Sequence, residues 1–371
     1  MFKLHVVQAK YGDALILSFG TSAKPRHILI DGGPSGNYAA DLEPALEKIV
    51  GKGGKLDLVV LSHVDNDHVV GLLDLFAAVE DDQVGDREPR TKIVGLWHNS
   101  FERTIDPTGA VGQQMQAIMT MAAAAKITTP LTTDTLDTFY GIKEGNRLRL
   151  MAKKLKVPTN KGFKDDVLLV ESAKAPIKFG PLELKIAGPN KANLKTLQTQ
   201  WLRWLEEAAQ KIAADPATAA MSDSSKPNLS SIVLLAKCDG KTILLTGDAR
   251  GDYIIEGLQT AGLAKNGKLH VDVLKVQHHG SNRNTTPDFF SAITADTYVL
   301  SADGRHGNPK VDTMKWIVEA ARHRRQPIAL VATNQTETIT ELQKKLPQAD
   351  FGYTLKLLSE REHSIEIVLN A

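Results

Sequence analysis

Several features are scarce in this chain of 371 residues, and each shortage narrows what the protein can be. Cys238 is its only cysteine, which excludes an intrachain disulfide and any metal site built from several thiolates. The formal net charge is +2, too small by itself to indicate nucleic-acid binding. Apolar runs are too short to span a bilayer, and the first residues lack the charged and then apolar blocks of a secretion signal. We therefore expect a cytoplasmic protein without a membrane span.

The composition is that of an ordinary soluble globular protein. Hydrophobic residues make up 42% of the chain and charged residues 24%. Because 371 residues exceed an average domain, one large domain with an insertion, or two domains, is expected. Cys238 lies in an apolar run with strand character, so we expect a buried and unreactive thiol.

Four potential metal ligands fall within six residues: His63, Asp65, Asp67 and His68. They lie between an apolar run at 56–61, which predicts a strand, and a helical pattern at 69–79. Burying an isolated charge costs several kcal/mol, so this grouping at a strand end indicates that a cation or water holds the side chains. The alternative is a polar turn in which Asp67 caps the helix, but capping explains only one of the four side chains.

Three other predicted strands also end in potential ligands. Asp31 follows a strand at 27–30, Asp248 follows one at 242–245, and the pair His278 and His279 follows one at 271–276. Oxygen and imidazole donors without thiolates suit zinc, manganese or iron and discriminate poorly among them. The donors suffice for two metals bridged by one carboxylate, which could lower the pKa of a shared water towards neutrality.

The apolar pattern predicts a layered α/β fold. One strand is expected before a turn at residues 11–13 and one after it, and a hairpin is expected at Asp239-Gly240. Further strands are expected at 93–97, 297–300, 328–332 and 365–369. Helices are expected at 41–50, 113–126 and 191–214. Thr286 and Asn308 each precede a proline and are expected to cap two more helices, the second running to about residue 325.

With these strand ends and polar residues, the chain resembles the metallo-β-lactamase superfamily of four-layer αββα sandwiches, and most closely the hydrolase domain of ComEC-type DNA-uptake proteins. The resemblance rests on motifs in the family order: Gly12-Asp13-Ala14, Leu29-Ile30-Asp31-Gly32-Gly33, Leu61-Ser62-His63-Val64-Asp65-Asn66-Asp67-His68, Asn228 with Ser231-Ile232-Val233, Leu244-Leu245-Thr246-Gly247-Asp248 and Lys275-Val276-Gln277-His278-His279-Gly280-Ser281.

The resemblance implies a role for each matching residue. His63 and Asp65 would bind one metal, Asp67 and His68 would bind the other, and Asp248 would bridge them. Either His278 or His279 would complete the second site. The metals would be two divalent ions, Zn²⁺ or Mn²⁺, with Asp65, Asp67 and Asp248 as the catalytic carboxylates. Asp31 would fix a ligand loop by hydrogen bonds, and Asn228 and Ser231 would shape the site.

Three departures from the family pattern matter. The commonest superfamily motif has a histidine where Asp65 stands, and the ComEC-like branch shares this change, which makes the first site harder and friendlier to manganese. The histidine that many members carry on a middle strand has no clear counterpart, and His98, at a strand end there, is expected to be a core or surface residue. The ComEC-like Gly-His-Pro appears as Gly307-Asn308-Pro309.

We expect one metallo-hydrolase domain over residues 1–371, an αββα sandwich interrupted at about 101–226. This largely helical insertion would form a lid, a substrate wall or a surface for a protein partner. Its content would distinguish the protein from its relatives.

The first functional hypothesis is a phosphodiesterase or nuclease in which a metal-bridged hydroxide attacks nucleic acid or a nucleotide. The second is hydrolysis of a small ester, lactone or amide; a β-lactamase is disfavoured by the missing secretion signal and by Asp65. A third is a non-catalytic interaction protein with a structural metal site. Loop side chains beside the metal histidines would hold the anionic or small-molecule substrate: Ser281, Arg283, Arg305, His306, Asn308 and Lys310.

Overall fold

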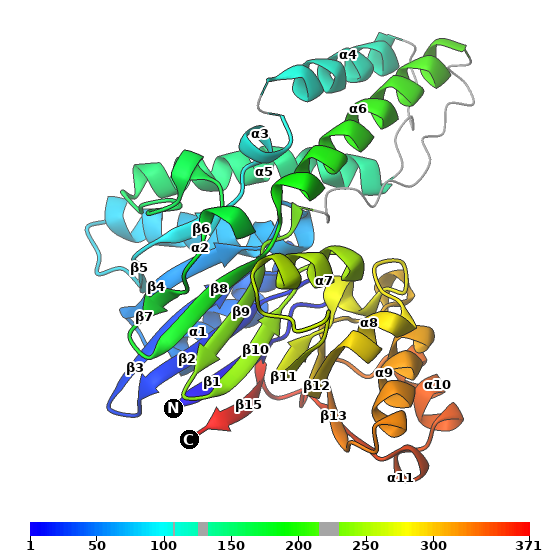
Figure 1. The fold of residues 1–371 in the computed structure, drawn as a ribbon. Helices are drawn as coiled ribbons and strands as arrows, with labels where there is room; N and C mark the ends of the chain where they lie inside the picture. The colour runs from blue at the N-terminus through cyan, green and yellow to red at the C-terminus, as the bar shows by residue number, and fades with distance from the viewer. Residues whose placement is uncertain (107, 125–132, 215–229) are drawn as a thin grey trace.

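The computed structural model describes residues 1–106, 108–124, 133–214 and 230–371. Two β-sheets lie at its centre, with helices outside both of them (Figure 1). The first sheet runs in the order β15 (Ser364–Asn370), β1 (Phe2–Val7), β2 (Leu15–Thr21), β3 (Lys24–Ile30) and β4 (Gly54–Leu61), with β5 (Thr91–Ile93) and β6 (Leu96–His98) both beside β4.

The second sheet runs from β14 (Tyr353–Leu357) through β13 (Ile328–Ala332), β12 (Ile293–Leu300), β11 (Leu269–Lys275), β10 (Lys241–Leu245), β9 (Val233–Cys238) and β8 (Leu182–Gly188) to β7 (Ile177–Phe179). Strands β10 to β14 are parallel, whereas β7 to β10 are antiparallel. Carboxyl ends of the parallel strands therefore meet at one edge, where α/β proteins commonly place their sites.

Successive side chains along each strand point to opposite faces of the sheet, and this alternation explains the layered packing. In β4, Leu58 and Val60 pack between the sheets, in one apolar cluster with Ile243 and Val273 of the second sheet. The intervening Val59 and Leu61 pack on the outer face, under the helices that cover the first sheet. The order helix, sheet, sheet, helix is the expected αββα sandwich.

Helices of the first half are η1 (Tyr38–Leu42), α1 (Glu43–Ile49), α2 (Asn66–Val84), α3 (Phe101–Thr104), α4 (Ala110–Ala124), α5 (Thr133–Lys154) and α6 (Lys191–Ala214). Those of the second half are α7 (Gly251–Thr260), α8 (Pro287–Ala292), α9 (Val311–His323), α10 (Glu337–Lys345) and α11 (Gln348–Phe351). The described helices include none that is both long enough and apolar enough to cross a bilayer.

Most predicted elements are confirmed, and three details differ. The single strand expected at 93–97 is divided into β5 and β6. Asn308 does not cap the following helix: α9 begins at Val311 with Lys310 at its N-cap, because Lys310 N donates to the carbonyl oxygen of Gly280 and ties this loop to its neighbour. Asp67 lies inside the first turn of α2 and is not its cap. By contrast, the Thr286 side chain accepts from Phe289 N as expected.

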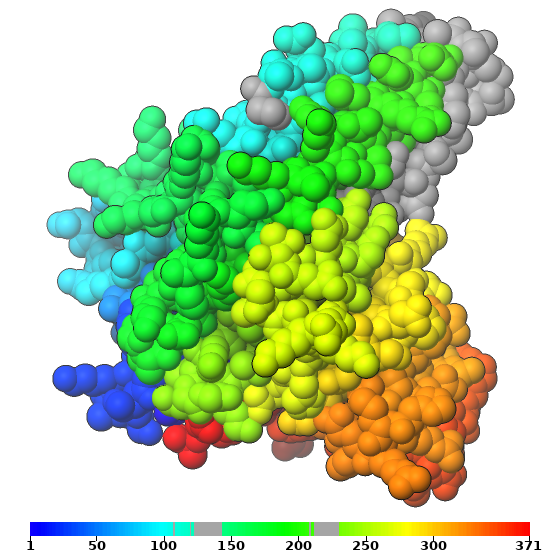
Figure 2. All heavy atoms as spheres, viewed as in Figure 1, coloured from blue at the N-terminus to red at the C-terminus, as the bar shows by residue number. Residues whose placement is uncertain are grey.

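Residues 101–226 contain elements of two kinds. Strands β7 and β8 extend the second sheet, and α5 packs against α2. Helices α4 and α6 instead pack on each other around Trp201 and Trp204 and project from the body of the molecule, as Figure 2 shows in cyan and green. The division of the chain into one domain with an insertion stays a prediction.

Cys238 confirms the expectation of an inert thiol. It is 1% exposed at the end of β9. Burial, with the neighbouring carboxylate of Asp239, raises the pKa of this thiol to about 11. The thiolate is therefore scarce near neutral pH.

Candidate metal centre

The loop between β4 and α2 carries the first group of predicted ligands. Asp65 takes an extended conformation at the N-cap position, and Asp67 lies in the first helical turn, where the helix dipole favours negative charge. The side chains of His63 and His68 are fully buried, whereas those of Asp65 and Asp67 remain about one-fifth exposed. The loop thus presents two buried imidazoles beside two carboxylates.

The second group comes from the other sheet. Strands β10 and β11 are parallel neighbours, with Ile243 opposite Val273, so the residues after each strand lie at the same edge. Asp248 follows β10, and His278 and His279 follow β11. Asp248 N donates to Ser231 Oγ at 3.3 Å, and His278 N donates to the carbonyl oxygen of Gly247, which fixes both loops.

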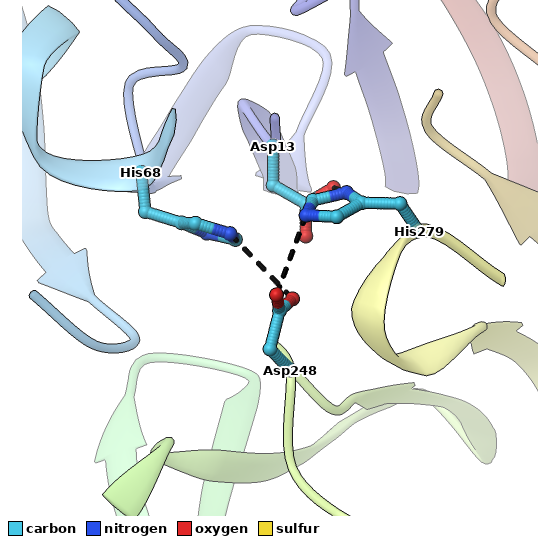
Figure 3. Close-up of side chains that lie close together, drawn as sticks. All are labelled: Asp13, His68, Asp248 and His279. Atoms are coloured by element: carbon cyan, nitrogen blue, oxygen red, sulfur yellow. Dashed lines mark ion pairs between the residues drawn. The ribbon is translucent and has the colours of Figure 1, made fainter. Parts of the chain in front are cut away.

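Asp248 lies at the centre of four imidazole rings (Figure 3 shows two of them). Its carboxylate oxygens are 3.4 Å from Nε2 of His279, 3.5 Å from Nε2 of His68, 3.7 Å from Nε2 of His278 and 3.8 Å from Nε2 of His63. In every case the nearest ring nitrogen is Nε2. Four donors of one chemical type therefore converge on one buried carboxylate.

Hydrogen bonds at the opposite ring nitrogens fix the tautomers of two of these histidines. His68 Nδ1 lies 2.9 Å from Asp31 Oδ2, and His279 Nδ1 lies 3.0 Å from the carbonyl oxygen of Ser301. Because a carboxylate and a carbonyl can only accept, both Nδ1 atoms carry the proton. Nε2 is then the atom with a lone pair for a cation.

The other two histidines follow the same pattern. His63 Nδ1 lies 3.0 Å from Ser62 Oγ, whose proton goes to Asp31 Oδ2 at 2.7 Å. His278 Nδ1 lies 2.6 Å from Asn284 Oδ1, while the amide nitrogen of Asn284 donates to the carbonyl oxygen of Asp248. Every Nδ1 thus has an acceptor, and every Nε2 faces Asp248.

The residues at this centre fit a divalent cation. Among the described residues, Nε2 of His63, His68 and His279 and Oδ1 of Asp248 are buried without a hydrogen-bond partner. Buried polar atoms nearly always have a hydrogen-bond partner, so a group of unpartnered ligand atoms indicates that a cation binds among them. The described residues also bring Asp13, His68, Asp248 and His279 within 4.8 Å of one another as a possible metal-binding set. The cluster is able to hold a metal, whose identity the donors leave open.

The carboxylates shift the ionisation of the buried imidazoles. Burial alone would lower the pKa of His68, but Asp248, Asp67 and Asp31 raise it well above 6.5 in the metal-free protein. Asp248 and Asp13 raise the pKa of His279 in the same way against the effect of burial. Burial would raise the pKa of Asp67, yet the histidines lower it to about 2. Protons therefore occupy this centre when metal is absent.

Asp31 is hydrogen-bonded to the ligand loop, and its supporting role stays a prediction. It is 1% exposed and accepts from Ser62 N and Ser62 Oγ, both at 2.7 Å, as well as from His68 Nδ1. One carboxylate thereby fixes the strand end and one imidazole together.

Two buried charges beside the centre were not identified from the sequence. Asp13 was noted only as part of a turn and a motif, and Lys275 only as part of a motif. They form an ion pair in which each is 1% exposed. Burial would raise the pKa of Asp13, but Lys275 and His279 lower it below its ordinary value. The usable signal was a carboxylate at a strand end beside glycine, which also marked Asp31.

The predicted substrate-contact residues lie on loops beside the histidines. Ser281 and Asn308 are buried, whereas Arg283, Arg305 and His306 are exposed. The guanidinium of Arg305 lies 3.7 Å from the ring centre of Tyr11, the residue before Gly12-Asp13. Lys310 Nζ donates to the carbonyl oxygen of His306. Asn228 lies outside the described residues.

His98 is a core histidine. It is fully buried at the end of β6, beside Val64 and Gly145, and neither ring nitrogen has a hydrogen-bond partner in the described part of the chain. Burial, reinforced by Arg149, lowers the pKa of His98 to about 3.

One family model matches part of the chain. The model of the metallo-beta-lactamase superfamily matches residues 25–146, a span that includes the 63–68 loop. The match covers less than half of the chain. None of the curated proteins matches the chain.

Solved structures similar to this chain have low sequence identity. A diphosphatase from the PhnP family is 11% identical, covering 100% of this chain and 98% of its own, with a TM-score of 0.40. A candidate metal-dependent hydrolase from Parabacteroides distasonis is 10% identical, covering 96% and 94%, with a TM-score of 0.36. The metallo-beta-lactamase SMB-1 is 12% identical, covering 92% and 96%, with a TM-score of 0.31. Similarity at this level does not bear on substrate.

Proposed function

We propose that the protein is a metal-dependent phosphodiesterase that acts on nucleic acid or nucleotides. The observation that carries the proposal is the position of Asp248, whose carboxylate lies within 3.8 Å of four imidazole Nε2 atoms. One carboxylate among four imidazoles would suit a pair of divalent cations that share it. The hydrolase activity of the superfamily supports the general class of reaction.

Each cation would have its own group of ligands. His63 and Asp65 would hold one cation. His278 also lies near Asp248 and would approach the same cation. Asp67, His68 and His279 would hold the other, since His279 Nε2 lies 3.2 Å from Asp67 Oδ2. Among the described residues, the Nε2 atoms of His63, His68 and His279 have no hydrogen-bond partner, which supports these assignments.

Bound divalent cations would lower the pKa of a water and withdraw charge from phosphoryl oxygens. The protein's own residues orient the ligands: Asp31 holds His68, and Asn284 holds His278. Asp65, Asp67 and Asp248 supply the negative charge that retains two cations. Zn²⁺ and Mn²⁺ both suit this set of imidazoles and carboxylates.

A phosphodiester substrate is favoured by Asp65. A carboxylate in place of the commonest histidine is shared with the ComEC-type hydrolase domain that the motifs resemble. Arg283, Arg305 and Lys310 would attract the anionic substrate from the rim, with Ser281, His306 and Asn308 nearby. A cytoplasmic location and a partner at the projecting helices α4 and α6 stay predictions.

The test uses purified protein with its metal content measured. Hydrolysis of bis-p-nitrophenyl phosphate, single-stranded DNA, double-stranded DNA and a lactone is compared for the wild type, Asp67→Ala and Asp248→Ala. Asp57→Ala is the matched control, because Asp57 is a buried carboxylate at the start of β4, away from the centre, and pairs with Arg26.

The proposal expects chelator-sensitive cleavage of phosphodiesters that both site variants lose and the control keeps. Turnover of the lactone alone would contradict the phosphodiesterase assignment. Metal binding without turnover of any substrate would favour the interaction-protein alternative. Unchanged metal content in Asp67→Ala and Asp248→Ala would refute the ligand assignment.

A further inference from the structure

The buried ion pair between Asp13 and Lys275 joins the two sheets next to the metal centre. Asp13 lies in the turn between β1 and β2 of the first sheet, and Lys275 is the last residue of β11 in the second. Both side chains are 1% exposed. Burying two charges is unfavourable unless they are well paired, so a pair at this depth calls for an explanation beyond stability.

Asp13 contacts the centre through its other oxygen. Its Oδ2 is paired with Lys275, whereas Oδ1 lies 3.4 Å from His279 Nδ1. Figure 3 shows Asp13 beside the His279 ring, with Asp248 at a different part of that ring. Nε2 of the same ring is the atom near Asp67 and Asp248. Asp13 therefore faces the protonated nitrogen of His279, and the carboxylates face the one with the lone pair.

The backbone of the same turn contacts the opposite ligand loop. Asp13 N donates to the carbonyl oxygen of Asp67 at 3.3 Å. Gly12 packs so closely on this carbonyl that a Cβ atom at Gly12 would lie 1.9 Å from it. Ser301 Oγ donates to the carbonyl oxygen of Gly12 at 2.6 Å, and the carbonyl oxygen of Ser301 accepts from His279. The turn thus joins Asp67 to His279.

From these contacts we infer that Asp13, held by Lys275, is a positioning residue that fixes His279 and the Asp67 loop for the second cation and is not itself a ligand. This inference rests on the metal site of the proposed function. Lys275 pairs with Oδ2 of Asp13 and so holds this carboxylate in place. The other oxygen places negative charge 3.4 Å from His279 Nδ1, which favours the proton that Nδ1 donates to the Ser301 carbonyl and keeps Nε2 available.

A double variant tests the inference without leaving a buried charge unpaired. Asp13→Leu with Lys275→Met replaces the pair by apolar side chains of similar volume, a change that folded proteins often tolerate. Arg26→Met with Asp57→Leu is the matched control, because it removes another ion pair of the first sheet that touches none of the proposed ligands.

Zinc affinity and stoichiometry are measured by competition with a chromophoric chelator, in the absence of substrate. We expect the double variant to bind two ions at saturation, with the affinity for one ion lower by about 10–100-fold, the usual effect of losing an outer partner of a ligand. The control should change affinity less than about twofold. A long-range ¹H–¹⁵N spectrum of the zinc-loaded double variant should also show a shifted His279 ring resonance.

Two results would overturn the inference. Unchanged zinc affinity and an unchanged His279 resonance would mean that the pair only joins the sheets. A maximum of one bound ion at saturation would make Asp13 a ligand. If the double variant does not unfold cooperatively, Asp13→Asn is measured in the same way, and unchanged affinity there refutes the positioning role.

The outcome is separable from that of the proposed function. Weaker zinc binding in the double variant, combined with a wild type that hydrolyses no phosphodiester, would sustain the positioning role and refute the phosphodiesterase. Strong phosphodiesterase activity of the wild type, combined with unchanged zinc affinity in the double variant, would sustain the phosphodiesterase and refute the positioning role.

Discussion

In the proposed function the ligands form two halves that share Asp248, and the halves differ in how their histidines are held. In the inner half, made of Asp67, His68 and His279, both imidazoles are almost completely buried, and His68 donates to a carboxylate. In the outer half, made of His63, Asp65 and His278, the imidazoles donate to a hydroxyl and an amide oxygen. His278 is 21% exposed, whereas His63 is as completely buried as His68.

This difference indicates unequal affinities. An imidazole that donates to a carboxylate is a more basic ligand than one that donates to a neutral oxygen. A buried ligand also excludes water that would compete for the cation. We therefore expect the inner half to bind its cation more tightly, and the outer half to exchange its cation more readily.

Removing Asp248 should abolish the distinction between the halves and have the largest effect. Because two cations supply several kcal/mol of transition-state stabilisation, Asp248→Ala should lower kcat/KM for bis-p-nitrophenyl phosphate by at least about 10³-fold. Metal analysis should show loss of both ions. Retention of one ion at full occupancy would show that Asp248 serves a single half.

The two adjacent histidines provide the sharpest comparison. Loss of a hydrogen-bond partner of a ligand lowers metal affinity by about 10–100-fold, so loss of a ligand from the tighter site should cost at least the upper value. His279→Ala should therefore weaken the tighter zinc site by at least about 100-fold. His278→Ala should weaken the other zinc site by about tenfold. Zinc titration of each variant measures this. Equal losses, or a larger loss in His278→Ala, would contradict the ranking of the halves.

Substituting the residues that hydrogen-bond to the histidines should weaken zinc binding more in the inner half than in the outer half. The effects should be smaller than those of losing a histidine. Asp31→Asn keeps the shape of the side chain but removes the charge that holds His68, and should cost about 10–100-fold in inner-site affinity. Asn284→Ala should cost the outer site about tenfold or less, because a neutral acceptor is lost. Both affinities are read from the same titration, with Asp57→Asn as the control. A larger effect of Asn284→Ala would show that charge at Nδ1 does not set the difference.

The metal-free protein should reveal the inner half through its pH dependence. Because the pKa of His68 is raised well above 6.5 on folding, the folded protein binds more protons than the unfolded chain above pH 6.5. The stability that this contributes is complete below pH 6.5 and is lost as the pH rises through the raised value. Lowering of the Asp67 pKa to about 2 contributes stability that is lost as the pH falls from 3.8 towards 2.

Urea unfolding between pH 6 and pH 9 measures this effect. The metal-free protein should lose free energy of unfolding as the pH rises, by about 1.4 kcal/mol for each proton released per pH unit. The zinc-loaded protein should not, because the cation takes the place of the protons. A metal-free His68→Gln variant should show a flatter profile, and an unchanged slope would assign the protons elsewhere.

The ligand loops could be predicted from the sequence because their information is local. His63 to His68 follow an apolar run that can only be a buried strand, and Asp248 and the histidine pair follow similar runs. Parallel pairing then brings strand ends together without further information. The hydrogen bonds that rank the halves depend on exact placement, so the choice between His278 and His279 was left open. The structure brings both to Asp248.

The rest depended on contacts between distant parts of the chain. Nothing local to Asp13 or Lys275 reveals that they pair, since the two lie on different sheets. Asn308 has the local pattern of a helix cap, but the hydrogen bond between Lys310 N and Gly280 delays the helix to Val311. Strand β7 has only three residues, too few for alternation to indicate pairing with β8.

The turn after β11 has a consequence for how this centre can change. Side chains of adjacent residues point to opposite faces in a strand, yet His278 and His279 both reach Asp248 because residues 278–280 have φ values of 49°, 54° and 83°. Left-handed backbone costs about 1–2 kcal/mol at each histidine, and glycine alone takes it freely. In the proposed centre, two neighbouring residues would thus supply ligands to both halves, so we expect one inserted or deleted residue in this turn to disable both cation sites together.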